Sequence, residues 1–212
     1  MKAAHWIIIA IIVISFIIGI YYYPQFPEEV ASHWNTQGEV DDYMPKFWGL
    51  FLMPIISVGL FILFLWLPNA DPYKENYKSF QNYFDGFIVI LVAFLFYIYL
   101  LTIAWTLGFT ANIGQLLTPA FGVLIYYCGV LISKAKRNWF VGIRNAWTLS
   151  SDKVWDKTHK LGGTLFKIAA VIAVIGGFFP EGTFWFVLLP IIAVVVIVFV
   201  YSYLVYKKTV TK

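Results

Sequence analysis

Histidine and acidic side chains come together in one short polar segment of a chain that is otherwise strongly apolar. Asp41 and Asp42 follow His33, and Glu28 precedes it. Imidazole and carboxylate groups are ligands that a divalent cation could use, but one histidine with scattered carboxylates matches no established metal-site spacing. We therefore predict no metal here. We interpret the segment around Asn35 as a hydrogen-bonded Asn-x-x-Gly turn over the mouth of a helix bundle.

The same segment, residues 24–46, is strongly acidic. It contains five carboxylates and a single basic residue, Lys46. An excess of negative charge on an exposed loop attracts cationic ligands, most strongly at low salt. The residues that we expect to capture such a ligand are Glu28, Glu29, His33, Asn35, Asp41 and Asp42.

A second polar segment, residues 134–163, combines basic residues with regularly spaced tryptophans. Trp139, Trp147 and Trp155 recur at intervals of eight residues. Because tryptophan prefers the headgroup level and Lys and Arg mark the inner side, we expect this segment to lie flat on the inner membrane face. His159 follows one helical turn after Trp155, but its neighbours lack a metal-ligand spacing, so we predict no metal there either.

The second half of this basic segment has the pattern of a short interfacial helix. Ser150–Asp152 supplies a capping hydroxyl and a negative charge at the expected helix start. One face of the predicted helix carries Val154, Trp155, Thr158 and Leu161. Gly162 and Gly163 are expected to end the helix and to form the turn into the next membrane span.

The apolar remainder of the chain determines the fold class. The 212 residues are 61% hydrophobic and 12% charged, and an ordinary soluble domain carries about twice that charge. The apolar runs that we assign as membrane spans cover residues 6–23, 47–67, 87–107, 116–133, 164–179 and 184–206. We therefore predict an all-α, polytopic protein of the cell membrane, with six transmembrane helices in the lipid bilayer. Cys128 is the single cysteine, so no disulfide forms within the chain.

The distribution of cations predicts the orientation of these spans. With the N-terminus inside, the inner loops and termini hold fourteen of the fifteen Lys and Arg residues, and Lys46 alone lies outside. Positively charged loops are retained on the cytoplasmic side of a membrane, so we predict that both termini are cytosolic. The acidic segment 24–46 then faces outward, and the basic segment 134–163 faces inward.

The spans show no pattern of catalysis or of ion coupling. Acidic residues are absent from their centres, where ion-coupled transporters usually place them, and there is no His-Glu-x-x-His protease pattern. His33 and His159, the candidates for a membrane enzyme, lie on opposite faces in the predicted topology. We therefore predict no enzymatic activity and no cofactor. A small solute transporter or channel is the alternative function.

Two segments resemble a known family. The signature of the SdpI family of multi-pass immunity proteins resembles the pattern Asn138-x-x-x-Gly142-Ile143-Arg144-x-x-Trp147-Thr148-Leu149-Ser150, continued by Val154-Trp155-x-Lys157-Thr158-His159-x-x-Gly162. The uncharacterised N-terminal domain that commonly accompanies it is similar to the segment Pro24–Lys46. The residues that the resemblance assigns to a cytoplasmic motif are Asn138, Gly142, Arg144, Trp147, Ser150, Trp155, Lys157, His159 and Gly162.

The resemblance implies a function that composition does not. In the best-known arrangement of the family, the immunity protein binds a secreted toxic peptide and then holds a cytosolic autorepressor at the membrane. The implied partners are therefore a secreted toxic peptide and a cytosolic repressor, without direct contact to nucleic acid. The chain would divide into an N-terminal two-helix region, 1–67, and a four-helix region, 68–212. It departs from the family at Asn145-Ala146, where Thr-Pro is frequent, so we expect a looser turn before Trp147.

The basic segment has residues that suit a docking surface on the cytosolic side. Arg144 can make forked contacts that a lysine cannot reproduce. Trp147 and Trp155 are expected to hold the segment at the membrane interface, and His159 lies on the same helix as Trp155. We therefore predict that this segment recruits the cytosolic partner, and that the outer acidic segment meets the toxin.

Overall fold

The structure, a computed structural model, describes residues 2–35 and 37–209, so the predicted inner position of Lys212 falls outside the described residues. Six of the described helices are long and apolar enough to cross a membrane. They are α1 (Ala3–Tyr22), α2 (Lys46–Ala70), α3 (Lys74–Thr106), α4 (Ile113–Lys134), α6 (Asp152–Gly176) and α7 (Thr183–Thr209). The other described elements are α5 (Ala146–Ser150), β1 (Glu29–Trp34) and β2 (Val40–Pro45).

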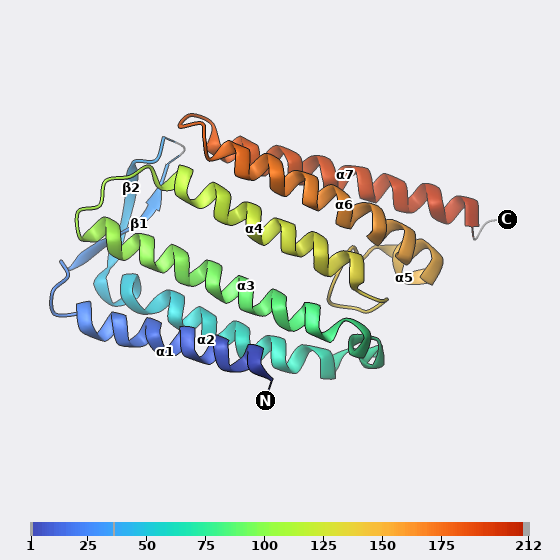
Figure 1. Ribbon diagram of the computed structural model, residues 1–212, viewed down its shortest axis with the longest axis horizontal. Coiled ribbons are helices and arrows are strands. Elements are labelled where there is room, and N and C mark those ends of the chain that lie inside the picture. The colour runs from blue at the N-terminus through green and yellow to red at the C-terminus, as the bar shows by residue number, and fades with distance from the viewer. Residues whose placement is uncertain (1, 36, 210–212) are drawn as a thin grey trace.

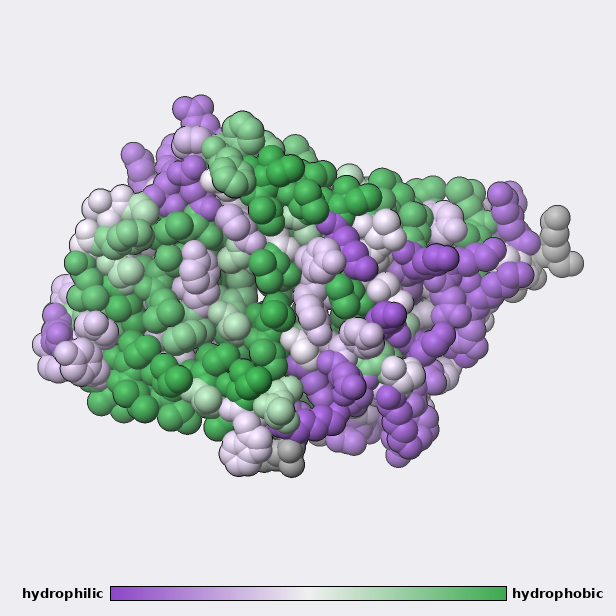
Figure 2. Space-filling view, viewed as in Figure 1, coloured by the Kyte–Doolittle hydropathy of each residue, from purple (hydrophilic) through white to green (hydrophobic). Residues whose placement is uncertain are grey.

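The long helices form one elongated bundle, with both termini at one end and the two strands at the other (Figure 1). We call these the terminal end and the hairpin end. Hydrophobic side chains cover much of the visible face, and hydrophilic ones gather at the terminal end (Figure 2). Many large apolar side chains point outward, for example Ile17, which is 59% exposed. A surface with so many exposed apolar side chains requires lipid around it. The prediction of a multi-pass, mainly helical membrane protein with six spans is therefore confirmed.

The acidic segment 24–46, interpreted above as a turn, contains a β-hairpin. Strands β1 and β2 pair antiparallel. The turn between them is fixed by Asn35, whose side-chain oxygen accepts the backbone N–H groups of Gln37 and Glu39 at 2.9 and 3.0 Å. Gly38 follows with a φ of +84°, a conformation that favours glycine. The predicted Asn-x-x-Gly turn is therefore present, and the strands that flank it are an addition to the helical fold.

The spans assigned from the sequence leave residues 68–86 as a polar loop between them, but most of this segment is helical. Helix α3 begins at Lys74, and its first turns bury Tyr77, Phe80 and Phe84 almost completely. These aromatic residues recur at intervals of three and four, which places them on one face of a helix. The polar residues between them occupy the opposite face. The low mean hydropathy of the segment therefore reflects an amphipathic helix end and not a loop.

Helix α6 does not end at Gly162 and Gly163, contrary to expectation. It runs without a break from Asp152 to Gly176. Both glycines are buried, and a Cβ on Gly163 would come within 2.7 Å of the backbone oxygen of Gly129 in α4. Gly163 and Gly129 therefore allow α4 and α6 to touch backbone to backbone, as small residues do at membrane-helix interfaces. Close packing, and not helix termination, explains why glycine stands here.

The helices share a core that joins the start and the end of the chain. Its largest cluster of buried residues takes members from α1, α2 and α3 and adds Leu131, Ala135 and Trp155 from the C-terminal half. Separate clusters lie between α4, α6 and α7, and below the hairpin. The division into regions 1–67 and 68–212 stays a proposal, since neither its boundary nor independent folding follows from these contacts.

A buried carboxylate ties α1 to α3 at the terminal end. Asp85 is 4% exposed, and its side chain accepts from Lys2 Nζ at 2.6 Å and from Gln81 Nε2 at 2.7 Å. The imidazole of His5 lies 3.9 Å away. Asp85 lies in α3 two residues before the apolar run 87–107, at the edge of the most hydrophobic part of this helix. Its contacts fix the N-terminus of the chain onto the bundle.

Candidate functional site

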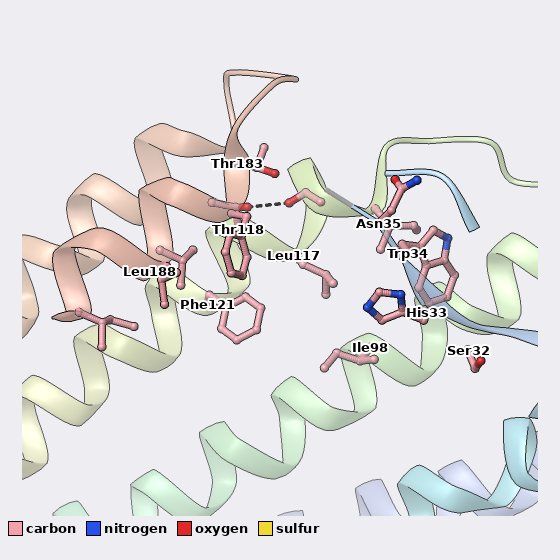
Figure 3. A pocket seen from close by; sticks show the side chains of 15 residues that line it. Ser32, His33, Trp34, Asn35, Ile98, Leu117, Thr118, Phe121, Thr183 and Leu188 are labelled. Carbon is pink, nitrogen blue, oxygen red and sulfur yellow. Dashed lines mark hydrogen bonds between the residues drawn. The ribbon is translucent and has the colours of Figure 1, made fainter. Parts of the chain in front are cut away.

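The hairpin end contains an apolar cavity of about 550 Å³. Its walls come from β1, α3, α4 and α7, as the stick view shows (Figure 3). The lining residues are Ser32, His33, Trp34, Asn35, Ile98, Ile113, Gly114, Leu117, Thr118, Phe121, Thr183, Phe184, Val187, Leu188 and Ile191. A concave apolar space with a few polar groups is the usual form of a ligand site. We treat this cavity as the first candidate site.

Aromatic packing and a helix cap hold the hairpin beside the cavity. Trp34 meets Trp105 of α3 edge to face, with 6.0 Å between the ring centroids. Asn112 caps α4 by accepting the backbone N–H of Gln115, and its amide donates to the carbonyl of Gln37 at 3.4 Å. The hairpin therefore contacts both α3 and the start of α4. The predicted position over the mouth of the bundle is consistent with these contacts.

Most of the cavity wall is hydrocarbon. The hydroxyl of Thr118 is already used, because it donates to the carbonyl of Gly114 at 2.6 Å (Figure 3). Among the described residues, the buried indole N–H of Trp34 has no hydrogen-bond acceptor. A buried donor without an acceptor costs about 1–3 kcal/mol. The wall of the cavity therefore favours an apolar ligand.

The predicted acidic residues surround the hairpin, and all four carboxylates are exposed. Asp41 lies 2.6 Å from Nδ1 of His33, and Glu28 lies 2.8 Å from Nζ of Lys46. Neither acidic residue lines the cavity, whereas His33 does. No group of three potential metal ligands occurs within residues 2–35 and 37–209. The six residues predicted to capture a ligand therefore form two groups. His33 and Asn35 line the cavity. The carboxylates lie on the strands and at their base, outside the cavity, and are Glu28, Glu29, Asp41 and Asp42.

The second candidate site is the basic segment at the terminal end, and its centre is Trp155. This side chain is fully buried and stacks on His159, with 3.8 Å between the ring centroids. Its indole N–H donates to the carbonyl of Ala135 at 2.8 Å. The expectation that Trp155 anchors the segment at the membrane interface is wrong, since an interfacial tryptophan keeps its N–H in water. Trp155 instead joins α6 to the end of α4.

His159 connects the segment before α5 to α6. Its Nε2 accepts the backbone N–H of Ile143 at 3.0 Å, and its Nδ1 lies 2.9 Å from the carbonyl of Trp155. This pattern specifies a neutral imidazole that carries its proton on Nδ1. Both ring nitrogens are therefore used inside the protein. His159 positions the chain, and neither a metal nor a cytosolic partner can reach its nitrogens without breaking these bonds.

Asn138 fixes the tight turn that follows α4. It is fully buried, and its side-chain oxygen accepts the backbone N–H groups of Phe140 and Val141. The hydroxyl of Tyr77 in α3 lies 3.3 Å from the same oxygen. Asp71, at the end of α2, accepts the backbone N–H of Trp139 at 2.9 Å. The turn is therefore fastened to the first half of the bundle, through Asp71 and Tyr77, which no sequence pattern indicated.

Two glycines of the motif leave room for these contacts. Gly142 has a φ of +116°, which L-residues with side chains rarely adopt, and a Cβ there would collide with Nε2 of His159. A Cβ on Gly162 would collide with Cδ1 of Ile143. The motif therefore has glycine at these two positions because a larger side chain would collide with His159 or Ile143.

The turn before Trp147 is well fixed without a proline, so the looser turn expected at Asn145-Ala146 is not what the structure has. Asn145 and Thr148 form a reciprocal capping box at the start of α5. The Asn145 amide also donates to the hydroxyl of Ser202 in α7 at 2.8 Å. Trp147 packs against Phe199 of the same helix, with 5.0 Å between the ring centroids.

The remaining motif residues face outward. Arg144, Ser150 and Lys157 are exposed. Arg144 donates to the carbonyl of Trp139 at 2.6 Å through one guanidinium nitrogen, which leaves part of its donor fork directed away from that contact. The motif therefore consists of a buried frame and a small exposed surface that the frame holds in place.

Comparisons with known proteins match both ends of the chain to described families. Residues 134–202, which contain the whole motif, match the SdpI/YfhL protein family, and residues 10–58 match a domain of unknown function (DUF1648). Over 201 residues the chain is 25% identical to "Immunity protein SdpI" of Bacillus subtilis (strain 168), and the alignment covers 94% of each chain. The chain is therefore similar to the SdpI family, both in the segment that carries the motif and over most of its length. No solved structure matches it.

The family match begins at the end of α4 and ends within α7. It therefore contains the buried frame around Trp155 and His159 and also the helix that Asn145 and Trp147 contact. The cavity at the hairpin end takes residues from both matched regions and from α3, which lies between them. The SdpI signature thus identified the site at the terminal end, whereas the cavity could be recognised only once the helices were assembled.

Proposed function

We propose that this protein gives immunity against a secreted, membrane-active peptide, and that the peptide is captured at the hairpin end. The observation that carries the proposal is an exposed acidic hairpin beside an apolar cavity of about 550 Å³. A peptide that attacks membranes combines cationic and apolar side chains. The carboxylates would attract its charge, and the cavity would remove an apolar side chain from the lipid. The similarity to an immunity protein supports this assignment.

The second part of the proposal concerns orientation. With the hairpin outside, the terminal end with Lys2, Lys207 and Lys208 lies in the cytosol, as the positive-inside rule requires. A peptide that arrives from outside would then meet the acidic hairpin first. The exposed residues Arg144 and Lys157 would face the cytosol and take part in docking a repressor there.

The proposal is tested by filling the cavity without disturbing its frame. Leu117→Trp places a larger apolar side chain in the cavity wall, and Leu204→Trp places the same side chain on the exposed face of α7, outside the cavity. Both variants are expressed in a toxin-sensitive strain, which is challenged with a panel of cationic membrane-active peptides. We expect Leu117→Trp to lose protection and Leu204→Trp to keep it at equal membrane expression.

A second pair of variants tests the charge. Glu29→Gln with Asp42→Asn removes two exposed carboxylates from the hairpin, and Lys153→Gln with Lys160→Gln removes two exposed cations from α6 as a matched control. The first pair should weaken binding of a labelled protective peptide to protein in nanodiscs at low salt, with a smaller effect at high salt. Unchanged protection in Leu117→Trp, together with unchanged peptide binding in the variant with Glu29→Gln and Asp42→Asn, would contradict capture at the hairpin end.

A further inference from the structure

A second apolar groove lies on the outside of the bundle, between α4 and α6. It has a volume of about 330 Å³ and is almost wholly hydrocarbon. The residues that line it are Gly122, Val123, Tyr126, Tyr127, Ala170, Val171, Val174 and Ile175. Small residues at its floor, Gly122 and Ala170, bring the two helices together, and exposed side chains such as Val123 and Val171 form its edges. The groove is separate from the cavity at the hairpin end, with which it shares no residue.

A lysine stands at one end of this groove, within a membrane-spanning helix. Lys167 precedes Ala170 by one helical turn and lies nine residues before Gly176, so it is about 14 Å from that end of α6. Its Nζ lies 5.9 Å from the ring centroid of Tyr126. Among the described residues, no carboxylate lies within salt-bridge distance of Lys167, whose side chain is partly exposed. An ionisable side chain in a span is costly and generally has a partner.

The direction of the lysine side chain shows where that partner lies. The Cγ of Lys167 passes beside Gly129, which is closer to the terminal end than Tyr126 is. The Cα–Cβ bonds of a helix tilt toward its N-terminus, which for α6 lies at the terminal end, so the side chain of Lys167 leaves the backbone on the headgroup side. The groove runs from Lys167 in the opposite direction, toward the hairpin end. One cation thus stands at the headgroup side of a groove that continues into the hydrocarbon.

More cations and polar groups continue the same surface toward the terminal end. Lys160, Thr164 and Lys167 follow each other on α6 at intervals of four and three residues, which places them on one helix face. Lys134, in the last turn of α4, has its Nζ 5.5 Å from the ring of Tyr83. Basic pockets between transmembrane helices at this level bind anionic lipid headgroups.

We propose that this groove is a binding site for one anionic phospholipid of the leaflet at the terminal end. The phosphate lies at Lys167, the lysines beyond it supply additional positive charge, and one acyl chain lies along Val123, Val171 and Ile175 toward the bilayer centre. A lipid explains both features together, since an ion alone would not use the apolar groove and a neutral lipid would not use the lysine. The bound lipid bridges α4 and α6 on the side where they face the membrane.

The test is lipid competition on the full-length protein in detergent, read by native mass spectrometry. Equal amounts of phosphatidylglycerol and phosphatidylcholine are supplied, and the ratio of the two bound lipids is measured. Lys167→Gln should lower the preference for phosphatidylglycerol about fivefold, the factor that one lysine near a membrane surface contributes. Lys167→Arg should keep the preference. Lys208→Gln, which removes an exposed lysine from α7, is the matched control and should behave as the unchanged protein.

The groove itself is tested by Val171→Trp, which fills it from its exposed edge. This variant should lose the retained lipid of either type, whereas Leu204→Trp on α7 should keep it. Thermal unfolding in the presence of inorganic phosphate separates a lipid site from an ion site. Stabilisation by phosphate equal to that by phosphatidylglycerol would overturn the assignment to a lipid. An unchanged lipid ratio in Lys167→Gln would overturn the role of Lys167.

Discussion

Replacing Trp155 by alanine should destabilise the whole site at the terminal end, and not only its exposed surface. The side chain is fully buried, so its removal leaves a cavity, and a buried Trp→Ala change costs about 3–5 kcal/mol. The change also leaves the carbonyl of Ala135 without its 2.8 Å donor and removes the ring on which His159 stacks. A protein of this size loses about 2–4 °C in Tm per kcal/mol. We therefore expect Tm to fall by about 6–20 °C.

The assay is thermal unfolding of the purified protein in detergent, followed by the fraction that remains monodisperse after heating. Trp155→Phe keeps a ring beside His159 and loses only the indole donor and some volume, so it should cost about 1–3 kcal/mol. Trp139→Ala is the matched control, because Trp139 is 49% exposed and should change stability by less than about 0.5 kcal/mol. The reasoning is refuted if Trp155→Ala and Trp139→Ala melt at the same temperature.

Three further predictions address other parts of the molecule. Gly142→Ala should destabilise the protein by about 1–3 kcal/mol, through its φ of +116° and the collision with the imidazole beside it, and a thermal melt that matches the unchanged protein would contradict this. Asp85→Asn should lower the free energy of unfolding by about 1–2 kcal/mol, a value between those of an exposed and a buried ion pair. It should also increase proteolysis near the N-terminus. Equal cleavage rates would argue against the ion pair between Lys2 and Asp85 as the contact that holds the N-terminus. Single cysteines at Gln25 and Ser150, in a Cys128→Ala background, test the orientation. An impermeant thiol reagent added to intact cells should label position 25 and leave position 150 unlabelled. The reverse result would show that the orientation is opposite to the one proposed.

The sequence was sufficient for the six spans and for the family resemblance, because both depend on signals carried by neighbouring residues. Apolar length predicts a transmembrane helix directly, and the motif around Trp147 has fixed spacing. The hairpin was missed because only its turn residues, Asn35 and Gly38, have a local signature. The helical start of α3 was missed because a mean over the segment hides a one-sided pattern of aromatic residues.

The functional detail was harder to predict, because side-chain burial depends on the partner helix. Tryptophan and histidine next to basic residues resemble an interfacial anchor. In the structure, however, the indole N–H of Trp155 donates to the carbonyl of Ala135, and Nε2 of His159 accepts the backbone N–H of Ile143. Likewise, Gly163 reads as a helix end in the sequence, and only the presence of Gly129 opposite it makes it a packing residue. Asp71 lies between two of the assigned spans, and no local pattern indicates that its carboxylate accepts the backbone N–H of Trp139, sixty-eight positions away.

The backbone contact between Gly129 and Gly163 has a mechanical consequence. Helices that touch at their main chains cannot slide past one another without separating, so α4 and α6 form one stiff lever. At the hairpin end, the cavity lies between this lever and α3, since Ile98 faces it from one side and Leu117 from the other. At the terminal end, Asp71 and Tyr77 contact Trp139 and Asn138 in the turn that follows α4, and so connect this end of the lever to the first half of the bundle. A molecule wedged into the cavity would therefore strain this connection on the opposite side of the membrane, and the two sites would report on each other through rotation of one rigid body.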